Sequence, residues 1–286
     1  MIPPRVRRTL MTTGAVATFL VLAGATYQGV ATALERRRFP HPGRLVDVGG
    51  HQLHLHCTGE GSPLVLLEAP ATGMSAAWGW VQPALAELTR VCSYDRAGLG
   101  WSEAGDARFE PQSVATQLHT LVERSNERAP FVLAGEGLGA AFAAMYAARF
   151  ADDVAALVLI DAPAGDEATR SETTRLVHVS PWLARAGVLR ATRLLSDHAR
   201  GLPQPSSGAL RAFLNRPDHL TRAARELAQW DEAVSLANAS PVSERIPVIR
   251  VGTRGAQRVA FLNDRGDAGT ATSGIVEAVN LVRQGL

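Results

Sequence analysis

The hydrophobic and polar positions first set apart the N-terminal end of the chain. No residue from Thr9 to Leu34 carries a charge, and arginines lie close on both sides of this segment. As a helix of about 25 residues it would be about 37 Å long, which exceeds the roughly 30 Å of a bilayer core. It also lacks the amphipathic pattern of a helix that packs on a soluble core. We therefore expect residues 1–38 to form a single-pass membrane anchor.

Two questions about this segment stay open in the sequence. The small residues at 31–33 suit a signal-peptide cleavage site, so a cleaved signal is the alternative to an anchor. Orientation is also ambiguous, because the arginines on the two sides nearly balance the positive-inside count. Our expectation is an uncleaved anchor with the globular part outside the cytoplasm.

The next part of the chain, residues 39–163, alternates between strand and helix patterns. Alternating polar and apolar residues predict an antiparallel pair at 45–48 and 52–57. Continuous apolar runs predict parallel strands buried on both faces, at 63–67, 91–94, 131–134 and 156–160. Helical patterns separate them, at 76–89, 111–128 and 140–150. The alternation predicts an α/β fold with a mostly parallel central sheet and helices on both faces.

Residues 164–245 read as helices alone, rich in Arg, Ala and Leu. A last strand is expected at 247–251 and a terminal helix at 273–283. We expect 164–245 to be a helical cap inserted between a first core part at 39–163 and a second at 246–286. The amphipathic, basic segment 181–195 favours a helix packed on the core, with contact to an anionic membrane surface as the alternative.

Composition narrows the classes of function. The chain is 46% hydrophobic and 20% charged, which excludes a disordered protein. Its net charge of +2 gives no clustered basic excess, so we expect no nucleic-acid partner. The chain has no lysine, and together with its abundant alanine this indicates a GC-rich bacterial genome.

Three motifs carry a resemblance to a known family. A strand pattern runs into the loop Glu68–Gly73, the loop Tyr94–Ser102 reads YDRAGLGWS, and Gly135–Gly139 follows a strand pattern and opens a helical one. In this combination the segment from about residue 44 to 286 resembles the α/β-hydrolase fold family with a helical cap. The resemblance implies a nucleophile, usually serine, on a strained elbow written G-x-S-x-G, with an oxyanion hole and a histidine–acid pair.

The sequence departs from this pattern at the nucleophile. The elbow motif consists of Gly135, Glu136, Gly137, Leu138 and Gly139, so glycine stands where the family places serine. Glycine tolerates the positive φ of such an elbow, but it has no hydroxyl, thiol or carboxylate with which to form a covalent intermediate. We expect a degenerate elbow.

The oxyanion region differs as well. If Glu68 and Ala69 align with the pair that ends the family's third strand, Pro70 takes the position of one oxyanion donor. Proline has no N–H, and losing one such donor typically costs about 10²–10³ in rate. The amide of Leu138 would remain as the other donor.

The general base is missing from its expected place. None of the eight histidines lies between Pro247 and Leu286, where the family has its catalytic histidine, so the last strand and its histidine loop look shortened. Three aspartates are candidates for a vestigial acid, namely Asp161, Asp166 and Asp264.

These departures together predict a pseudo-hydrolase. We expect a membrane-anchored binding or regulatory partner, either of an active homologous serine hydrolase in a heterodimer or of a second copy of the chain. A small apolar ligand is a further expectation, and neither a cofactor nor a metal is expected.

Two other functions are kept as alternatives. A weakly active hydrolase of small apolar esters would use Glu136 as a general base on water. Residues 135–140 also fit G-x-G-x-x-G/A, and Asp161 ends the next strand pattern, as in a dinucleotide-binding oxidoreductase. That fingerprint normally lies on the first strand of its sheet, whereas several strands precede it here.

Four further residues have two interpretations each. Cys57 and Cys92 fall on strands that are neighbours in the family, so a disulfide is possible in an exported domain, with two separate buried thiols favoured. His54 and His56 share one face of a strand and could hold a metal, but the solvent side of an edge strand is the favoured place for them.

Overall fold

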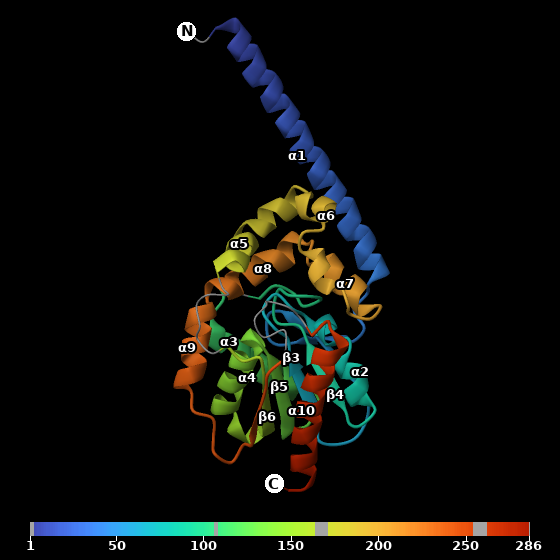
Figure 1. Cartoon of the computed structure of the whole chain (residues 1–286), viewed down its shortest axis with the longest axis vertical. Coiled ribbons are helices and arrows are strands. Elements are labelled where there is room, and N and C mark those ends of the chain that lie inside the picture. The colour runs from blue at the N-terminus through green and yellow to red at the C-terminus, as the bar shows by residue number, and fades with distance from the viewer. Residues whose placement is uncertain (1–2, 106–107, 164–170, 254–261, 286) are drawn as a thin grey trace.

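The computed structural model describes residues 3–105, 108–163, 171–253 and 262–285, which fold around a seven-stranded sheet (Figure 1). The strands, in the order β1-β2-β4-β3-β5-β6-β7, are β1 Arg44–Asp47, β2 Gln52–Thr58, β4 Val91–Tyr94, β3 Val65–Glu68, β5 Phe131–Glu136, β6 Val154–Ile160 and β7 Val248–Val251. β2 is antiparallel to both of its neighbours, and the other pairs are parallel. The predicted α/β fold with a mostly parallel sheet is confirmed.

Alternate residues of the inner strands supply two separate hydrophobic cores. Leu66 and Leu133 pack in one cluster, while Val65 and Val132 belong to the other, because successive side chains of a strand point to opposite faces. The helices that cover the sheet are α3 Pro111–Ser125 and α4 Leu138–Arg149 on the first face, and α2 Val81–Ala86 and α10 Arg265–Arg283 on the second.

Two helices differ in extent from their predicted ranges. The segment 76–89 forms a short 3₁₀ turn, η1 Ser75–Trp78, and then α2, with Gly79 between them. α10 starts at Arg265 instead of 273, because the side chain of Asp264 accepts hydrogen bonds from the amides of Gly266 and Asp267 and so caps the helix. The first turns of α10 are rich in Gly and Thr and lack an apolar stripe, so the sequence pattern missed them.

A set of helices is inserted between β6 and β7. These inserted helices are α5 Ser171–Arg185, α6 Val188–Thr192, the short 3₁₀ turn η3 Ser196–Ala199, α7 Ser206–Phe213, α8 Pro217–Ala228 and α9 Trp230–Ala239. They lie across one end of the sheet, with α5 and α8 above the strands (Figure 1). That they form a separate cap domain remains a prediction.

The N-terminal helix α1, Pro4–Arg38, has 35 residues and projects from the rest of the protein (Figure 1). Among the described residues it is the one helix that is long and apolar enough to cross a membrane. Its C-terminal part lies beside α6 and α7, so the helix is not a free tail throughout.

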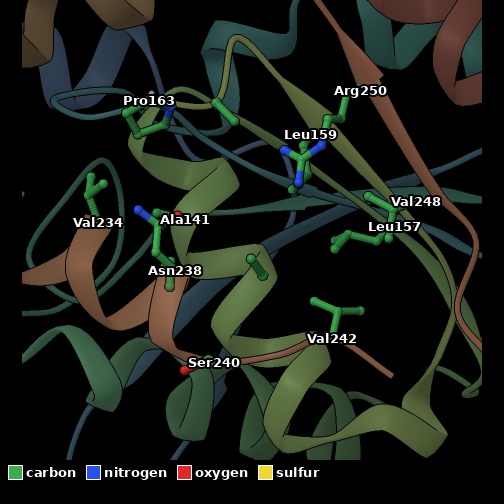
Figure 2. A pocket seen from close by; sticks show the side chains of 13 residues that line it. Ala141, Leu157, Leu159, Pro163, Val234, Asn238, Ser240, Val242, Val248 and Arg250 are labelled. Carbon is green, nitrogen blue, oxygen red and sulfur yellow. The ribbon is translucent and has the colours of Figure 1, made fainter. Parts of the chain in front are cut away.

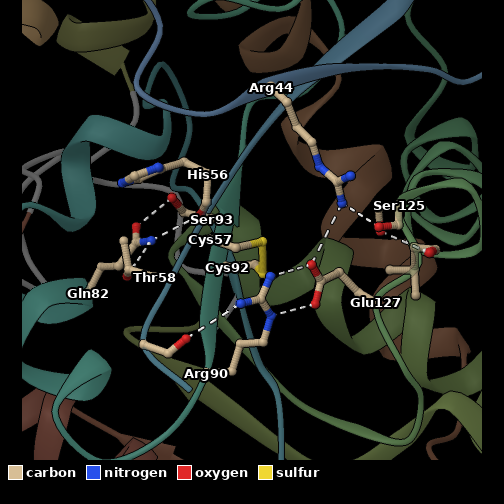
Figure 3. Close-up of a disulfide and its surroundings, with 12 residues drawn as sticks. Arg44, His56, Cys57, Thr58, Gln82, Arg90, Cys92, Ser93, Ser125 and Glu127 are labelled. Carbon is tan, nitrogen blue, oxygen red and sulfur yellow. Dashed lines mark hydrogen bonds and ion pairs between the residues drawn. A yellow bond between two sulfur atoms is a disulfide. The ribbon is translucent and has the colours of Figure 1, made fainter. Parts of the chain in front are cut away.

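Cys57 and Cys92 form a disulfide, so the favoured expectation of two separate thiols is wrong (Figure 3). The two residues lie opposite each other in the antiparallel β2–β4 pair, with their Cα atoms 4.0 Å apart. At this distance the two side chains face each other directly across the strand pair. No local sequence signal predicts the register of β2 against β4 that places them there. Beside the disulfide, Glu127 pairs with Arg90 at 2.7 Å.

The sheet ends at β7. Within the described ranges no strand pairs with the outer side of β7, and the chain continues from Thr253 to Leu262 through residues outside those ranges before α10 begins. The described part of the chain therefore holds no strand in the place of the expected histidine-bearing strand.

Candidate functional site

Gly137 forms a sharp turn between β5 and α4. Its backbone has φ 55° and ψ −123°, and its amide donates to the carbonyl of Ile160 at 2.9 Å. A Cβ added at Gly137 would meet only the Cβ of Pro70, at 3.8 Å, which is an ordinary contact. The position therefore has the conformation of a strained elbow and room for a side chain, but it carries none.

The two flanking glycines of the motif have a packing explanation. A Cβ at Gly135 would collide with the carbonyl oxygen of Gly139, and one at Gly139 would collide with that of Ala69. Both glycines thus allow α4 to approach β5 and the loop after β3 closely. The G-x-G-x-x-G/A pattern needs no dinucleotide to account for it.

The loop after β3 lies directly beside the elbow, as its comparison with an oxyanion loop requires. Pro70 contacts the elbow position but has no N–H for an oxyanion. The carbonyl oxygens of Ala69 and Pro70 accept hydrogen bonds from Arg96, at 2.6 and 3.0 Å. The loop therefore presents carbonyl acceptors to an arginine side chain, whereas an oxyanion hole would present N–H donors to a substrate.

Arg96 is the centre of a buried charge cluster, defined as Glu68, Tyr94, Arg96, Arg222 and Glu226. Its guanidinium lies 2.6 Å from Glu68 and 2.8 Å from Glu226, and Tyr94 donates to Glu68. Arg222 makes a longer contact of 3.5 Å with Glu226. Since Arg222 and Glu226 belong to α8, the cluster ties the inserted helices to the strand ends.

Burial and pairing set the ionisation of the charge cluster. Burial alone would raise the pKa of Glu226, but Arg96 and Arg222 hold that pKa below its usual value. Burial raises the pKa of Glu68, although Arg96 and Tyr94 oppose the shift. Two arginines thus face two glutamates, and the cluster is balanced within the protein without any ligand.

Glu136 lies next to the elbow and is 3% exposed. Its Oε2 atom is buried and has no hydrogen-bond partner among the described residues. Burial, followed by the nearby charges of Asp161 and Asp267, raises its pKa well above the usual value. The raised pKa disfavours the ionised form of the Glu136 carboxyl, which is the form that could accept a proton as a base.

The three candidate acids are not brought together. Asp161 ends β6 in a left-handed conformation with φ 47°, and its carboxylate accepts from the amide of Thr253 at 2.6 Å. Asp264 is the N-cap of α10, a structural role that accounts for it. Asp166 lies outside the described residues.

The buried His219 has both ring nitrogens occupied. The amide of Gly100 donates to Nδ1 of His219, and Nε2 of His219 lies 3.0 Å from the carbonyl oxygen of Thr72. This arrangement requires the neutral tautomer with its proton on Nε2. Burial lowers the pKa of His219, which agrees with that assignment.

His54 was expected on the solvent side of an edge strand, and that expectation is wrong. β2 lies between β1 and β4, and His54 is fully buried. Its Nδ1 lies 3.0 Å from Asp95 and 3.4 Å from the hydroxyl of Ser75. Because the serine and the aspartate meet the same nitrogen, the three groups cannot relay a proton as a catalytic triad does. The sequence offered no signal for this cluster, since its members are far apart in the chain.

An apolar pocket lies beside the edge strand, and its lining does not include the elbow residues (Figure 2). Its volume is about 310 Å³, and it is bounded by α4, α9 and the strands β6 and β7. Arg250 is the charged residue in the pocket lining. The other lining residues are Ala141, Ala144, Leu157, Leu159, Ala162, Pro163, Val234, Ala237, Asn238, Ser240, Val242 and Val248. The size and lining suit a small apolar ligand.

Comparisons with known proteins agree on the fold. A family model described as alpha/beta hydrolase fold matches residues 62–232, more than half of the chain. An AB hydrolase superfamily protein of Gibberella zeae is 28% identical over 197 residues, covering 64% of this chain and 59% of that protein. The solved structure of the epoxide hydrolase CorEH superposes with a TM-score of 0.65 and 22% identity, covering 84% of this chain and 99% of that one.

A further relative is named for a membrane. An uncharacterized vacuolar membrane protein of Saccharomyces cerevisiae is 29% identical over 129 residues, covering 39% of this chain and 20% of that protein. The chain spans less than two thirds of the length of the curated relatives that it matches first. These relatives come from fungi and bacteria, so a bacterial source stays a prediction.

Proposed function

Because this chain belongs to the α/β-hydrolase fold family, we propose that it is a non-catalytic member of that family, anchored in a membrane by α1 and acting as a binding partner. The partner we favour is an active homologous hydrolase. The observation that carries the proposal is the elbow, where Gly137 keeps the strained backbone of a nucleophile position and has no side chain.

The surroundings of the elbow support the same conclusion. Hydrolysis on this fold needs a base to activate a nucleophile and donors to stabilise an oxyanion. The buried His219 uses both ring nitrogens in hydrogen bonds to the backbone. On the oxyanion side, Arg96 holds the carbonyls of Ala69 and Pro70.

Two features support a location at a membrane and outside the cytoplasm. α1 has the length and composition of a membrane span. The Cys57–Cys92 disulfide is typical of oxidising compartments, because cytosolic thiols are kept reduced. A fold-level analogy favours binding to an active relative, since related chains often associate through a shared surface.

The first test is activity. The purified full chain is assayed in detergent against short aryl esters and labelled with a fluorophosphonate probe, beside a known serine hydrolase. We expect background turnover and no label, both for the native chain and for Gly137→Ser, because the sequence has no histidine after β7, where the family places its base, to activate the new hydroxyl. Turnover by the native chain would overturn the proposal. Labelling of Gly137→Ser would show that a base lies within reach of the elbow, contrary to the structure.

The same assay addresses the esterase alternative. The unpaired, buried carboxyl of Glu136 beside the elbow is the observation in its favour. Because burial raises its pKa, base catalysis by this carboxyl would increase as the pH rises. An esterase rate that rises with pH and vanishes in Glu136→Gln would replace the proposal with this alternative.

The second test is association. Affinity-tagged full chain is purified in mild detergent from the native host, and bound proteins are identified by mass spectrometry and assayed for hydrolase activity. The proposal predicts a stoichiometric homologous hydrolase. A monomer that carries no such partner, as measured by light scattering, would contradict the partner role.

A further inference from the structure

α1 is fixed to the inserted helices along one stripe of its surface. Gly24, Gln28 and Glu35 follow one another at spacings of four and seven residues, which places them on one helix face. The Gln28 side chain is 5% exposed and donates to the carbonyl of Asn215 at 2.7 Å. Arg190 of α6 donates to Gln28 at 3.0 Å and pairs with Glu35 through two hydrogen bonds. The Gln28 bond is buried and the Arg190 contacts are half-buried, and together these directional contacts define one docked position.

The same stripe makes a close backbone approach at its upper end. A Cβ added at Gly24 would collide with the carbonyl oxygen of Ala186, and one at Gly187 would lie 2.9 Å from the carbonyl oxygen of Gly24. The turn between α5 and α6 therefore packs directly on α1 at this level. Any larger residue at Gly24 would push the helix away from that turn.

This docking shortens the part of α1 that is free to enter a bilayer. The uncharged residues from Thr9 to Ala23 precede the docked part, and they make a helix of about 15 residues, or about 22 Å. A bilayer core is about 30 Å thick. Since the free part is shorter than this, α1 can span the bilayer only if the bilayer surface reaches at least the level of Gly24 and the α5–α6 turn.

The side chains around that turn suit a bilayer surface. Four apolar side chains are exposed there, led by Trp182 at 73%, together with Val179, Val188 and Leu194. The guanidinium of Arg185 lies 5.1 Å from the centre of the Trp182 ring, and Arg193 is also exposed. Tryptophan is enriched at membrane–water interfaces, and arginines near the surface are attracted to anionic lipids.

We propose that this α5–α6 surface, defined as Val179, Trp182, Arg185, Val188, Arg193 and Leu194, rests on the anionic leaflet of the membrane that α1 crosses. The inference rests on the proposed membrane anchor, and it assigns the surface to lipid and not to a protein partner. Continuity with the docked α1, the short free span and the pairing of a tryptophan with arginines together carry it. The inserted helices thus face the bilayer, and the sheet extends away from it.

The test uses the full chain in lipid nanodiscs with spin labels on single introduced cysteines, since the native cysteines are joined in a disulfide. Labels are placed by Leu194→Cys on the surface, by Val16→Cys in the free span and by Glu244→Cys on an exposed loop before β7. In phosphatidylcholine with phosphatidylserine, the label at 194 should meet lipid-soluble oxygen severalfold more readily than a water-soluble nickel reagent. The label at 244 should show the reverse.

Variants of the surface sharpen the result. Trp182→Ala combined with Arg185→Glu should return the label at 194 to water while the label at 16 stays in lipid. Leu88→Ala, at an exposed apolar residue on the other side of the protein, should change neither. Phosphatidylcholine alone should weaken the contact, because the arginines then lose their anionic partners.

The contrary outcomes are distinct. A label at 194 that meets water while the label at 16 meets lipid would overturn the surface and leave the anchor standing. A label at 16 that meets water would overturn the anchor and, with it, the membrane part of the proposed function. Shielding of 194 from both reagents would assign the surface to a protein, which also overturns the inference.

Discussion

At the scale of single residues, the buried carboxyl of Glu136 lowers the free energy of unfolding at neutral pH. Its carboxyl is buried with one unpaired oxygen, and burial raises its pKa in the folded state. In the unfolded chain the same carboxyl ionises near the usual pKa of 4.5. Above that pH the folded state binds more protons than the unfolded state, so this group makes the protein less stable as pH rises.

Glu136→Gln should therefore stabilise the protein at alkaline pH. The amide resembles the protonated carboxyl in shape and cannot ionise. We expect Tm to rise by about 2–4 °C at pH 8, which corresponds to about 1 kcal/mol for a domain of this size, and to change little near pH 4. Differential scanning fluorimetry across this pH range measures the effect. Glu87→Gln, at an exposed position, is the control and should leave the pH dependence unchanged.

At the scale of elements, the charge cluster joins α8 to β3 and to the loop after β4. Glu226→Gln would leave Arg96 buried without its strongest partner, and breaking a buried ion pair from one side typically costs about 3–5 kcal/mol. We expect a loss of this size in urea unfolding. Amide hydrogen exchange should speed up first in α8, because that helix loses its tie to the core.

The matched control for this loss lies on the same helix. Arg225 precedes Glu226 and is exposed, so Arg225→Gln should change stability by less than about 0.5 kcal/mol. If the two variants destabilise equally, the charge cluster does not hold the inserted helices on the sheet.

The elements that the sequence predicted are those with a local signal. Continuous apolar runs identified the parallel strands, and the glycine pattern at 135–139 placed a turn between a strand and a helix. The position of Pro70 beside Gly137 also follows from the family pattern. For the strands and the turn the information lies within a few consecutive residues, whereas the contact of Pro70 with Gly137 comes from the resemblance to the family.

Contacts between distant residues had no such signal. Arg96 and Glu226 are separated by 130 positions, and His219 reaches the backbone of Thr72 across 147. The disulfide depends on a strand register that the pattern does not determine. The docking of α1 has one local signal, because Gln28 is the one amide side chain in the uncharged segment from Thr9 to Leu34.

At the scale of the whole molecule, the disulfide links the fold to its compartment. It closes a loop of 35 residues between two neighbouring strands. Replacing Cys57 and Cys92 with alanine should lower the free energy of unfolding by about 2–4 kcal/mol, because the unfolded chain then gains conformational freedom. Denaturant titration measures this loss, and the reduced native chain should match the double variant.

The oxidation state can be read in cells. Protein from the native host should react with a maleimide–polyethylene glycol reagent only after reduction, as seen by a mass shift on a gel. Reaction of both cysteines without reduction would place the globular part in a reducing compartment and contradict an exported orientation.

Among the described residues no strand pairs with the outer side of β7, and this has a consequence for self-association. Unpaired strand edges offer main-chain donors and acceptors to any other strand, and natural proteins often protect them with a charged side chain. β7 reads Val, Ile, Arg, Val, so Arg250 is the one charge among β-branched residues. This arginine would act as a gatekeeper against edge-to-edge aggregation, a role that hydrophobic replacement would remove even though the fold itself would persist.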